Sequence, residues 1–182
     1  APEAWLSGAN MLCNLGWSAG LAWLQGVVVP DNLPWAETGL DKQKSGREWK
    51  RLGEAPREGR LGDASLQASI ILPQGRKGPA FIAYPNFQVY FEWNQSFTYV
   101  TTAAYFATRL EGASPYIAGS PDTALSGAEM KQLQMRLQAL GYNVGKVDGI
   151  LGANTRDAVQ DVQQKLGLPA DAWPTHELLN RL

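Results

Sequence analysis

The stretch LGYNVGKVDGILGANT, residues 140–155, decides how the C-terminal part of this chain folds. Asp148 can accept backbone N–H groups within a turn, and Thr155 has the position expected in the first turn of a following helix. Glycines recur at short intervals and suit a tight loop with positive φ angles: Gly145, Gly149 and Gly152. The residues therefore predict a structured loop between two helices.

A helix is predicted on the N-terminal side of this loop. Ser126 and Glu129 have the S-x-x-E spacing of a capping box, which starts a helix, and Gly141 is placed to end it. The apolar stripe of this helix comprises Met130, Leu133, Leu137 and Leu140. The first helix of the C-terminal part therefore has both a start and a stop signal.

Two further helices are predicted after the loop. One runs from about residue 154 to 166 and ends at Gly167, and a short one begins near Pro174 and Thr175. Their buried faces comprise Ala158, Val159, Val162 and Leu166 in one helix and Leu178, Leu179 and Leu182 in the other. Together with the first helix they predict a compact three-helix unit over 127–182.

A linker precedes this unit. The stretch EGASPYIAGSPDTALSG, residues 111–127, is small and polar and contains two prolines, as is typical of a connection between domains. We place the first region at 1–115, the linker at 116–126 and the three-helix unit at 127–182.

The first region mixes helices and strands. We expect a helix over about 3–15 that ends at Gly16, a strand at VVV (27–29), and a short helix in SGREWKRLG that closes at Gly53. The segments ASIILP and PAFIAY flank the turn QGRKG and predict a β-hairpin.

A third strand and a long helix are expected to follow the hairpin. NFQVYFEW (86–93) alternates, which predicts a strand with Phe87, Val89, Phe91 and Trp93 on one face. SFTYVTTAAYFATRL predicts a helix, with Asn94 or Ser96 as N-cap and a helically spaced set of Tyr99, Ala103, Phe106 and Leu110.

An unusual mixture of rings and amides lies where these two elements meet. Trp93, Asn94, Gln95 and Tyr99 cluster at the predicted strand-to-helix junction. Aromatic faces stack on the apolar faces of sugar rings, while amides bond to hydroxyl and N-acetyl groups. The cluster indicates a glycan-binding surface, and an N-cap role for Asn94 is the structural alternative.

Composition narrows the classes of function. The net charge is −1, and basic and acidic residues balance on both sides of the linker, so the chain lacks the basic surplus of nucleic-acid-binding proteins. The single cysteine, Cys13, is expected to be a buried small hydrophobe, and the single histidine, His176, to face solvent. We expect no metal site, no cofactor, no membrane span and no signal peptide in this sequence.

The ordered pattern L-G-Y-x-x-G-x-x-D-G-x-x-G-x-x-T resembles the peptidoglycan-binding domain type 1 across 127–182. Val162 stands where an aromatic residue is usual, and Ala172 where glycine is usual. The resemblance implies a shallow groove for cell-wall stem peptide or glycan. Tyr142, Asp148 and Arg156 are the candidate groove residues, from their positions beside the loop.

Segments of the first region resemble the C-terminal portion of the lytic murein transglycosylase B family, soluble type. They are SGANMLCNLGWSAGLAW, EWKRLG, IILPQGRKGPAFIAYPNF and EWNQSFTYVTTAAYFATRL, in the family's order over 1–112. The resemblance implies that Asn94 and Tyr99 line a saccharide cleft, that Trp93 supplies a ring there, and that Asn10 reaches it, whereas Met11 replaces a tyrosine.

The resemblance also implies an α+β fold, a partial lysozyme-like transglycosylase region with a small antiparallel β subdomain, followed by the three-helix domain. The family reaction is non-hydrolytic cleavage of the MurNAc–GlcNAc β-1,4 bond, in which one Glu serves as acid and then base and a 1,6-anhydro end remains. The segment that carries this Glu in the family is not found in the sequence, so we expect a fragment without the catalytic acid. Glu92 is the fallback acid.

Three functions stay open: part of a lytic transglycosylase, a non-catalytic peptidoglycan-binding protein, and a conventional two-carboxylate glycosidase that uses Glu92. The expected partners are glycan strands, stem peptides and the N-terminal half of the same protein, and neither nucleic acid nor membrane. The expected location is the bacterial periplasm or cell envelope.

Overall fold

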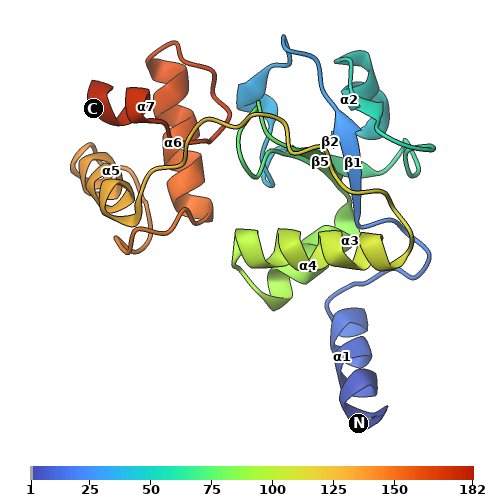
Figure 1. The fold of residues 1–182 in the computed structure, drawn as a ribbon. Coiled ribbons are helices and arrows are strands. Elements are labelled where there is room, and N and C mark those ends of the chain that lie inside the picture. The colour runs from blue at the N-terminus through green and yellow to red at the C-terminus, as the bar shows by residue number, and fades with distance from the viewer. Residues whose placement is uncertain (1) are drawn as a thin grey trace.

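The computed structural model describes the backbone of residues 2–182 and the side chains from residue 6 onward. It has the mixed helix and sheet content of an α+β protein (Figure 1). In chain order the elements are α1 (Pro2–Asn14), β1 (Leu24–Val28), the 3₁₀ helix η1 (Trp35–Glu37), β2 (Lys44–Ser45), α2 (Gly46–Arg51), β3 (Ala55–Pro56), β4 (Gln67–Ile71), β5 (Ala80–Ala83), α3 (Pro85–Trp93), α4 (Phe97–Leu110), α5 (Gly127–Ala139), α6 (Ala153–Lys165) and α7 (His176–Arg181).

The strands form one five-stranded antiparallel sheet in the order β2-β4-β5-β1-β3. The predicted hairpin is confirmed as β4 and β5, with Ile70 opposite Ile82 and Ile71 opposite Phe81. Successive residues of a strand point to opposite faces, and both faces of this sheet are covered. The sheet is therefore the central layer of the first region.

Each face of the sheet has its own core. Ile70 and Ile82 pack with Trp49 of α2, and all three side chains are fully buried. On the other face Phe81 packs with Phe87 of α3 and with the buried side of α4. The helices predicted at SGREWKRLG and SFTYVTTAAYFATRL are confirmed, and each ends near its expected residue.

The strand predicted at residues 86–93 is wrong, because this segment is the helix α3. Pro85 occupies the first turn, where its fixed φ favours a helix, and the eight residues after it are too few for alternation to distinguish a strand from a helix. Phe87 and Val89 are buried as expected, but Trp93 is 45% exposed. The ring-and-amide cluster therefore lies between two helices and not between a strand and a helix.

The face that α4 buries also differs from the expected one. Tyr99, Phe106 and Leu110 are exposed, whereas the buried side comprises Phe97, Val100, Thr101 and Ala104. The two sets have the same helical spacing, so periodicity alone could not decide between them. The buried face is selected by α3 and the sheet, which pack against Phe97, Val100 and Ala104.

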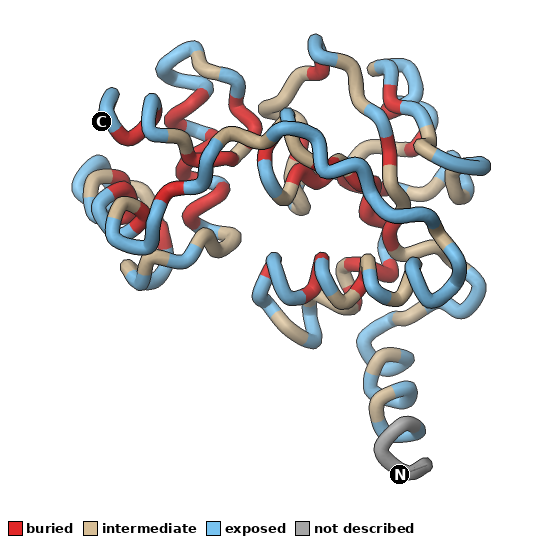
Figure 2. Tube along the Cα trace, viewed as in Figure 1, coloured by how far each residue is buried: buried red, intermediate tan, exposed pale blue. Residues whose placement is uncertain are grey.

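Helix α1 projects from the rest of the molecule (Figures 1 and 2). It ends as predicted, with Gly16 at a φ of +100°. Cys13 is exposed, so the expectation that it is buried is wrong. The loop after the helix is fixed by the buried Asn86, which accepts a hydrogen bond from the Ser18 nitrogen at 2.9 Å and donates to the Ser18 and Leu21 oxygens.

The three predicted C-terminal helices are confirmed as α5, α6 and α7 around a core of their own. Ser126 and Glu129 form the predicted capping box, and Thr175 caps α7. Leu140 and Leu166 are exposed, unlike the rest of their predicted stripes. His176 is exposed as expected and lies 3.1 Å from Glu129.

Residues between α4 and α5 have no helix or strand, and they are bound to the first region. Arg57 donates to the oxygens of Ser114 and Pro115 at 2.8 and 2.7 Å. The Ser120 nitrogen donates to the Lys77 oxygen at 2.9 Å. The connection is therefore pinned along the surface of the first region before it reaches α5.

The three-helix unit is docked closely against the β4–β5 turn. Gly75 of this turn has a φ of +74°, and a Cβ on it would lie 2.6 Å from the Cβ of Trp173. Its neighbour Arg76 donates its backbone N–H to a carboxylate oxygen of Asp171 at 2.9 Å. Only glycine has both the backbone conformation and the small size that this approach requires.

Candidate functional site

The turn between α3 and α4 holds the predicted ring-and-amide cluster at the surface. Asn94 ends α3 with an extended backbone, and its side-chain oxygen accepts a hydrogen bond from the Ser96 nitrogen at 2.9 Å. Ser96 is the N-cap of α4 and accepts a hydrogen bond from the Tyr99 nitrogen. The side chains of Asn94 and Ser96 thus shape the turn, and Ser96 rather than Asn94 is the cap.

Two exposed rings flank this turn. The ring centres of Trp93 and Tyr99 are 5.9 Å apart, with their planes inclined at 50°. Trp93 is 45% exposed and Tyr99 is 52% exposed, so each ring presents surface to solvent. Gln95 between them is exposed as well. Rings beside amides at a surface can stack on a sugar and bond to its polar groups.

Two other candidates from the sequence, Asn10 and Glu92, do not join the Trp93–Tyr99 pair in a pocket. Asn10 is exposed on α1, and within residues 6–182 no hydrogen bond or ring contact joins it to Trp93 or Tyr99. Glu92 is exposed at the end of α3. A glycosidic acid works best in an apolar pocket, which this exposed position does not provide.

A carboxyl group that sequence reasoning missed is buried elsewhere. Glu54, after α2, is 3% exposed, and neither of its carboxylate oxygens has a hydrogen-bond partner among the described residues. Burial raises its pKa to about 7, although the nearby Lys50 acts in the opposite direction. Its oxygens do not reach the surface, so a substrate could not receive a proton from them directly.

In the three-helix unit the loop is organised around Gln134, a residue that sequence reasoning did not select. This fully buried side chain donates to the Ile150 oxygen at 3.0 Å and accepts from the Gly149 nitrogen at 2.9 Å. Thr155 donates to the Val144 oxygen at 3.0 Å. Most residues of the loop pattern thus serve to hold the loop in shape through hydrogen bonds within the unit.

The predicted loop geometry is confirmed in most details. Asp148 accepts a hydrogen bond from the Ile150 nitrogen at 2.9 Å, and this backbone bond lowers its pKa. Gly145 and Gly149 have positive φ angles, but Gly152 does not, because it is the N-cap of α6 with a φ of −84°. Two of the three glycines therefore serve the left-handed turn.

The three candidate groove residues lie in different surroundings. Asp148 is exposed on the loop, and Tyr142 is half-buried, with its hydroxyl 2.6 Å from the Lys165 ammonium. Arg156 is 8% exposed and points into the contact with the first region. Within the described residues no hydrogen bond or ion pair joins these three side chains to one another.

Arg156 holds the two regions together. It donates to the Leu72 and Pro73 oxygens at 3.5 and 2.7 Å, and its guanidinium carbon lies 4.4 Å from the ring centre of Phe97. Burial lowers its pKa to about 10, although Asp171 and Asp157 act in the opposite direction. It remains charged at neutral pH.

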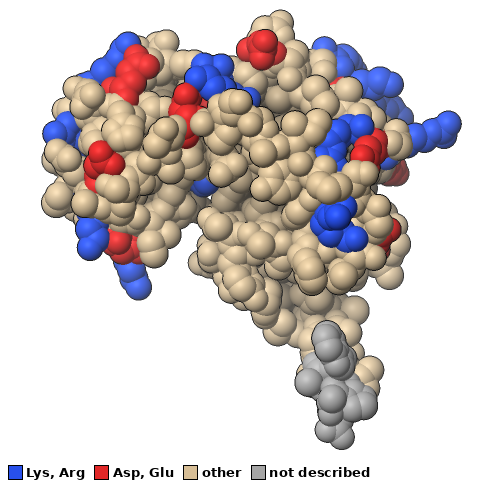
Figure 3. Space-filling view, in the orientation of Figure 1, with Lys and Arg blue, Asp and Glu red and all other residues tan. Residues whose placement is uncertain are grey.

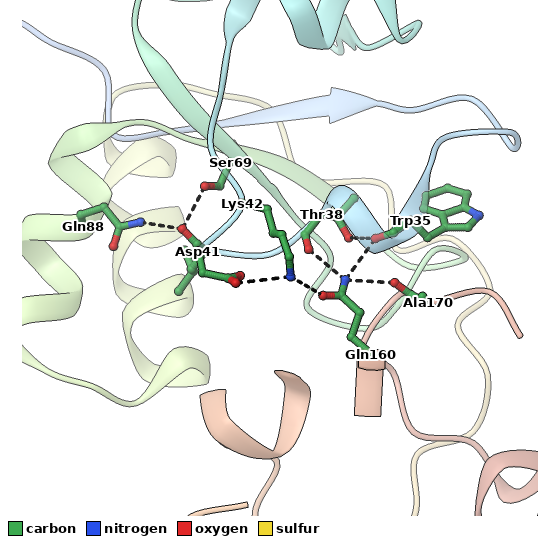
Figure 4. Close-up of polar contacts among 9 residues, drawn as sticks. Trp35, Thr38, Asp41, Lys42, Ser69, Gln88, Gln160 and Ala170 are labelled. Carbon is green, nitrogen blue, oxygen red and sulfur yellow. Dashed lines mark hydrogen bonds and ion pairs between the residues drawn. The ribbon is translucent and has the colours of Figure 1, made fainter. Parts of the chain in front are cut away.

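Gln160 makes the second contact between the regions (Figure 4). Its amide nitrogen lies within hydrogen-bond distance of the Trp35 and Thr38 oxygens, at 3.1 and 2.9 Å, and of the Ala170 oxygen, at 3.0 Å. Its oxygen accepts from the Lys42 ammonium at 2.9 Å. Both ends of the amide are thus used at the contact.

Two further features of residues 2–182 bear on other classes of site. No helix in this range is long and apolar enough to cross a bilayer. Among residues 6–182, whose side chains are described, no group of three or more His, Cys, Asp or Glu side chains could hold a metal ion. In Figure 3, Lys and Arg gather at the upper right of the face shown, with Asp and Glu beside them, and both signs of charge are mixed on the left lobe.

Comparison with protein families gives two matches. Residues 1–108 match the model described as the transglycosylase SLT domain, and residues 126–182 match the putative peptidoglycan binding domain. The first match alone covers more than half of the chain.

Solved structures give a second comparison. The chain is similar to SltB3 from Pseudomonas aeruginosa in complex with NAG-anhNAM-pentapeptide, with a TM-score of 0.79 and 36% identity over 95% of this chain and 48% of that one. A second SltB3 structure, with NAG-NAM-pentapeptide, matches equally well. The chain spans about half the length of SltB3.

Curated relatives match over a shorter range. The spore cortex-lytic enzyme of Bacillus cereus is 46% identical over 46 residues, which are 25% of this chain and 18% of the relative. N-acetylmuramoyl-L-alanine amidase CwlM of Mycobacterium tuberculosis is 41% identical over 58 residues, 32% of this chain and 14% of the relative. The chain thus spans under a fifth of the length of each.

Proposed function

This chain belongs to the transglycosylase SLT domain family, and from that membership we propose that it forms part of a peptidoglycan lytic transglycosylase. The reaction is cleavage of the MurNAc–GlcNAc β-1,4 bond, which leaves 1,6-anhydroMurNAc ends. The observation that carries the proposal is the similarity to SltB3 over nearly the whole chain, because that protein has been crystallised with an anhydro-muramyl pentapeptide.

Within this reaction we assign binding and not catalysis to the residues of this chain. The Trp93 and Tyr99 rings would stack on sugar rings, and Asn94 and Gln95 would bond to hydroxyl or N-acetyl groups. Asn10 would reach the same strand from α1. Exposed rings at a turn fixed by Asn94 and Ser96 support this assignment, because a rigid site loses little freedom when it binds.

Residues 126–182 would add a second attachment to the wall, through the unit that matches the putative peptidoglycan binding domain. Its candidates that reach the surface are Asp148, which is exposed, and Tyr142, which is half-buried. Arg156 is buried at the contact between the regions, so it would touch only a ligand that enters this contact. We place this activity at the cell envelope, outside the cytoplasm, where peptidoglycan lies.

A second candidate function is a non-catalytic peptidoglycan-binding protein. The exposed Trp93–Tyr99 pair and the C-terminal unit could both hold glycan without cleaving it. A two-carboxylate glycosidase that uses Glu92 lacks a comparable observation, because Glu92 is exposed at the end of its helix.

Incubation with purified sacculi tests the proposal. We expect the chain to sediment with the sacculi and to release no soluble fragments, because the residues of this chain are assigned to binding. Soluble fragments with anhydro-muramyl ends would show that the chain itself carries the catalytic acid, whereas sedimentation without fragments leaves the two functions to be separated by the variants of the intact enzyme. A chain that stays in the supernatant contradicts both.

The binding residues are tested in the intact enzyme. Asn94→Ala and Tyr99→Ala are expected to lower the release of anhydro-muropeptides, whereas Glu92→Gln is expected to leave it unchanged. If Glu92→Gln abolishes release, the assignment of this carboxylate as a bystander is wrong.

A further inference from the structure

Helix α1 has little packing of its own to set its direction. Among the described side chains of this helix, residues 6–14, none is buried. The helix projects beyond α3 and α4, and its C-terminal end is the end nearest to them (Figure 1). The direction of α1 relative to the ring-and-amide cluster therefore depends on the loop that follows it, residues 15–23.

Asn86, in the first turn of α3, holds the middle of this loop. The residue is 1% exposed. Its side-chain oxygen accepts from the Ser18 nitrogen, and its amide nitrogen donates to the Ser18 and Leu21 oxygens, each over 2.9 Å. A primary amide supplies both an acceptor and two donors at one position. All three bonds go to backbone atoms, so they fix the path of the loop independently of its side chains.

Two further contacts hold the ends of the loop to the same pair of helices. Near the start of the loop, the ring centre of Trp17 lies 5.1 Å from that of Tyr90, which is one turn after Asn86 on α3. At its end, Trp23 donates from its ring nitrogen to the Ala104 oxygen of α4 at 3.1 Å. The loop is thus attached to α3 at two points and to α4 at one.

The ring-and-amide cluster lies at the other end of α3. Trp93 is the last residue of this helix, and Asn94 and Ser96 form the turn into α4. The helix has nine residues, and with a rise of about 1.5 Å per residue its two ends are about 14 Å apart. One short helix therefore carries the anchor of the α1 loop at one end and the edge of the cluster at the other.

From these contacts we infer that Asn86 is a positioning residue for glycan binding. It holds α1 in one direction relative to the Trp93–Tyr99 pair, so that Asn10 on α1 meets the same glycan strand as the two rings. Groups that are held in place before binding lose less freedom than groups on a mobile arm. The inference rests on the proposed function, because it takes glycan as the ligand of the cluster.

The first test measures the direction of α1 in the full chain without a ligand. Cys13 on α1 is exposed and is the single cysteine of the sequence, so it takes one nitroxide label, and Thr102→Cys takes a second on α4. Pulsed electron–electron double resonance is expected to give one narrow distance distribution. Asn86→Leu, of similar size, should broaden it about twofold, because the loop backbone loses three hydrogen bonds.

Ser69→Ala is the matched control. Ser69 is also 1% exposed, and its hydroxyl donates to the Leu40 oxygen at 3.1 Å. This variant loses a buried hydrogen bond of the first region but none in the α1 loop, so the distribution should stay narrow. A broad distribution in the wild type, or equal broadening in both variants, contradicts the inference.

Hydrogen exchange of the wild-type chain gives a measurement that does not depend on whether Asn86→Leu folds. Ser18 is exposed, but its N–H is bonded to the buried Asn86. Its amide should therefore exchange slowly for an exposed loop residue. Exchange at the rate of an unstructured peptide would contradict the anchoring of the loop.

The second test asks whether the position of α1 matters for binding. Asn10→Ala is expected to weaken calorimetric binding of a NAG–NAM oligosaccharide about fivefold in the wild type, because one hydrogen bond is lost. In the Asn86→Leu background the same change should have no further effect, since Asn10 is then no longer held beside the strand. An equal effect in both backgrounds contradicts the role of Asn86.

This inference and the proposed function fail in different ways. A chain that binds the oligosaccharide with an affinity that neither Asn10→Ala nor Asn86→Leu changes overturns this inference and leaves the proposed function. A chain that does not bind the oligosaccharide at all overturns the proposed glycan binding and this inference with it, even where the label distances are narrow.

Discussion

The side-chain oxygen of Gln160 lies 2.9 Å from the ammonium of Lys42, across the contact between the three-helix unit and the first region. The nitrogen of the same amide meets carbonyl oxygens from both sides of that contact. A neutral amide can satisfy donors and acceptors together, which neither a carboxylate nor an ammonium can do. Gln160 therefore contributes an uncharged link to the contact, beside the charged Arg156.

Gln160→Ala is expected to lower the free energy of unfolding by about 2 kcal/mol, because it leaves buried carbonyl groups without donors. Chemical denaturation measures this loss. Gln164→Ala is the control, because Gln164 is exposed on the same helix. Similar effects from the two variants would contradict the role of Gln160.

Glu54 makes stability depend on pH with a definite sign. Its pKa is about 7 in the folded chain against an ordinary 4.5, so the folded state keeps a proton that the unfolded state loses between these values. Unfolding free energy should therefore fall as pH rises from 4.5 to 7, by about 3 kcal/mol in total, and stay level above that range.

Glu54→Gln cannot titrate and should remove this dependence. Between pH 4.5 and pH 8 the variant should therefore lose less unfolding free energy than the wild type. Denaturation midpoints at several pH values measure the two curves. Glu111→Gln, at an exposed site, should leave the wild-type slope intact. Parallel curves for wild type and Glu54→Gln would show that the buried carboxyl is already ionised.

Ala172→Gly should stabilise the three-helix unit. Ala172 has a φ of +60°, in the left-handed region where a Cβ is strained. Among residues 2–182 it is the only residue other than glycine with a positive φ. Glycine relieves the strain but has more freedom in the unfolded chain. The net effect should raise the free energy of unfolding by about 0.5 to 1 kcal/mol.

The control for Ala172→Gly is Ala139→Gly. Ala139 ends the helix α5 and has ordinary helical geometry, so glycine there should destabilise by up to about 1 kcal/mol. Thermal unfolding measures both. A loss of stability in Ala172→Gly would contradict the strain argument.

Trp93→Ala should weaken binding of a NAG–NAM oligosaccharide about tenfold, because a stacked ring contributes on the order of 1 to 1.5 kcal/mol. Calorimetric titration measures the affinity. Phe106→Ala removes another exposed ring of α4, one that lies outside the Trp93–Tyr99 pair. Equal losses would show that the pair has no special place in glycan binding.

The sequence was sufficient wherever local signals and burial agree. The capping box at Ser126, the stop at Gly16 and the hairpin around Ile70 and Ile82 were all predictable, because each depends on neighbours in the chain. The positive φ at position 172 explains why glycine is usual there, and nothing in the structure explains the alanine.

Long-range packing accounts for what the sequence could not give. Alternation at 86–93 was mistaken for a strand because Phe87 and Val89 are buried in either geometry. Arg156 looked like a groove residue from its place beside the loop, but its partners Leu72 and Pro73 are more than 80 residues away. The burial of Glu54 and Gln134 has the same origin.

The pinned connection between α4 and α5 changes how two wall-binding surfaces can cooperate. On a free tether, the second surface would search a sphere around the first, and its effective concentration would depend only on linker length. Here Arg57 and Lys77 fix the path of residues 114–120, so the two surfaces keep one separation and one relative angle. Under the proposed function, the two surfaces would therefore bind together only where two sites on the wall stand at that separation.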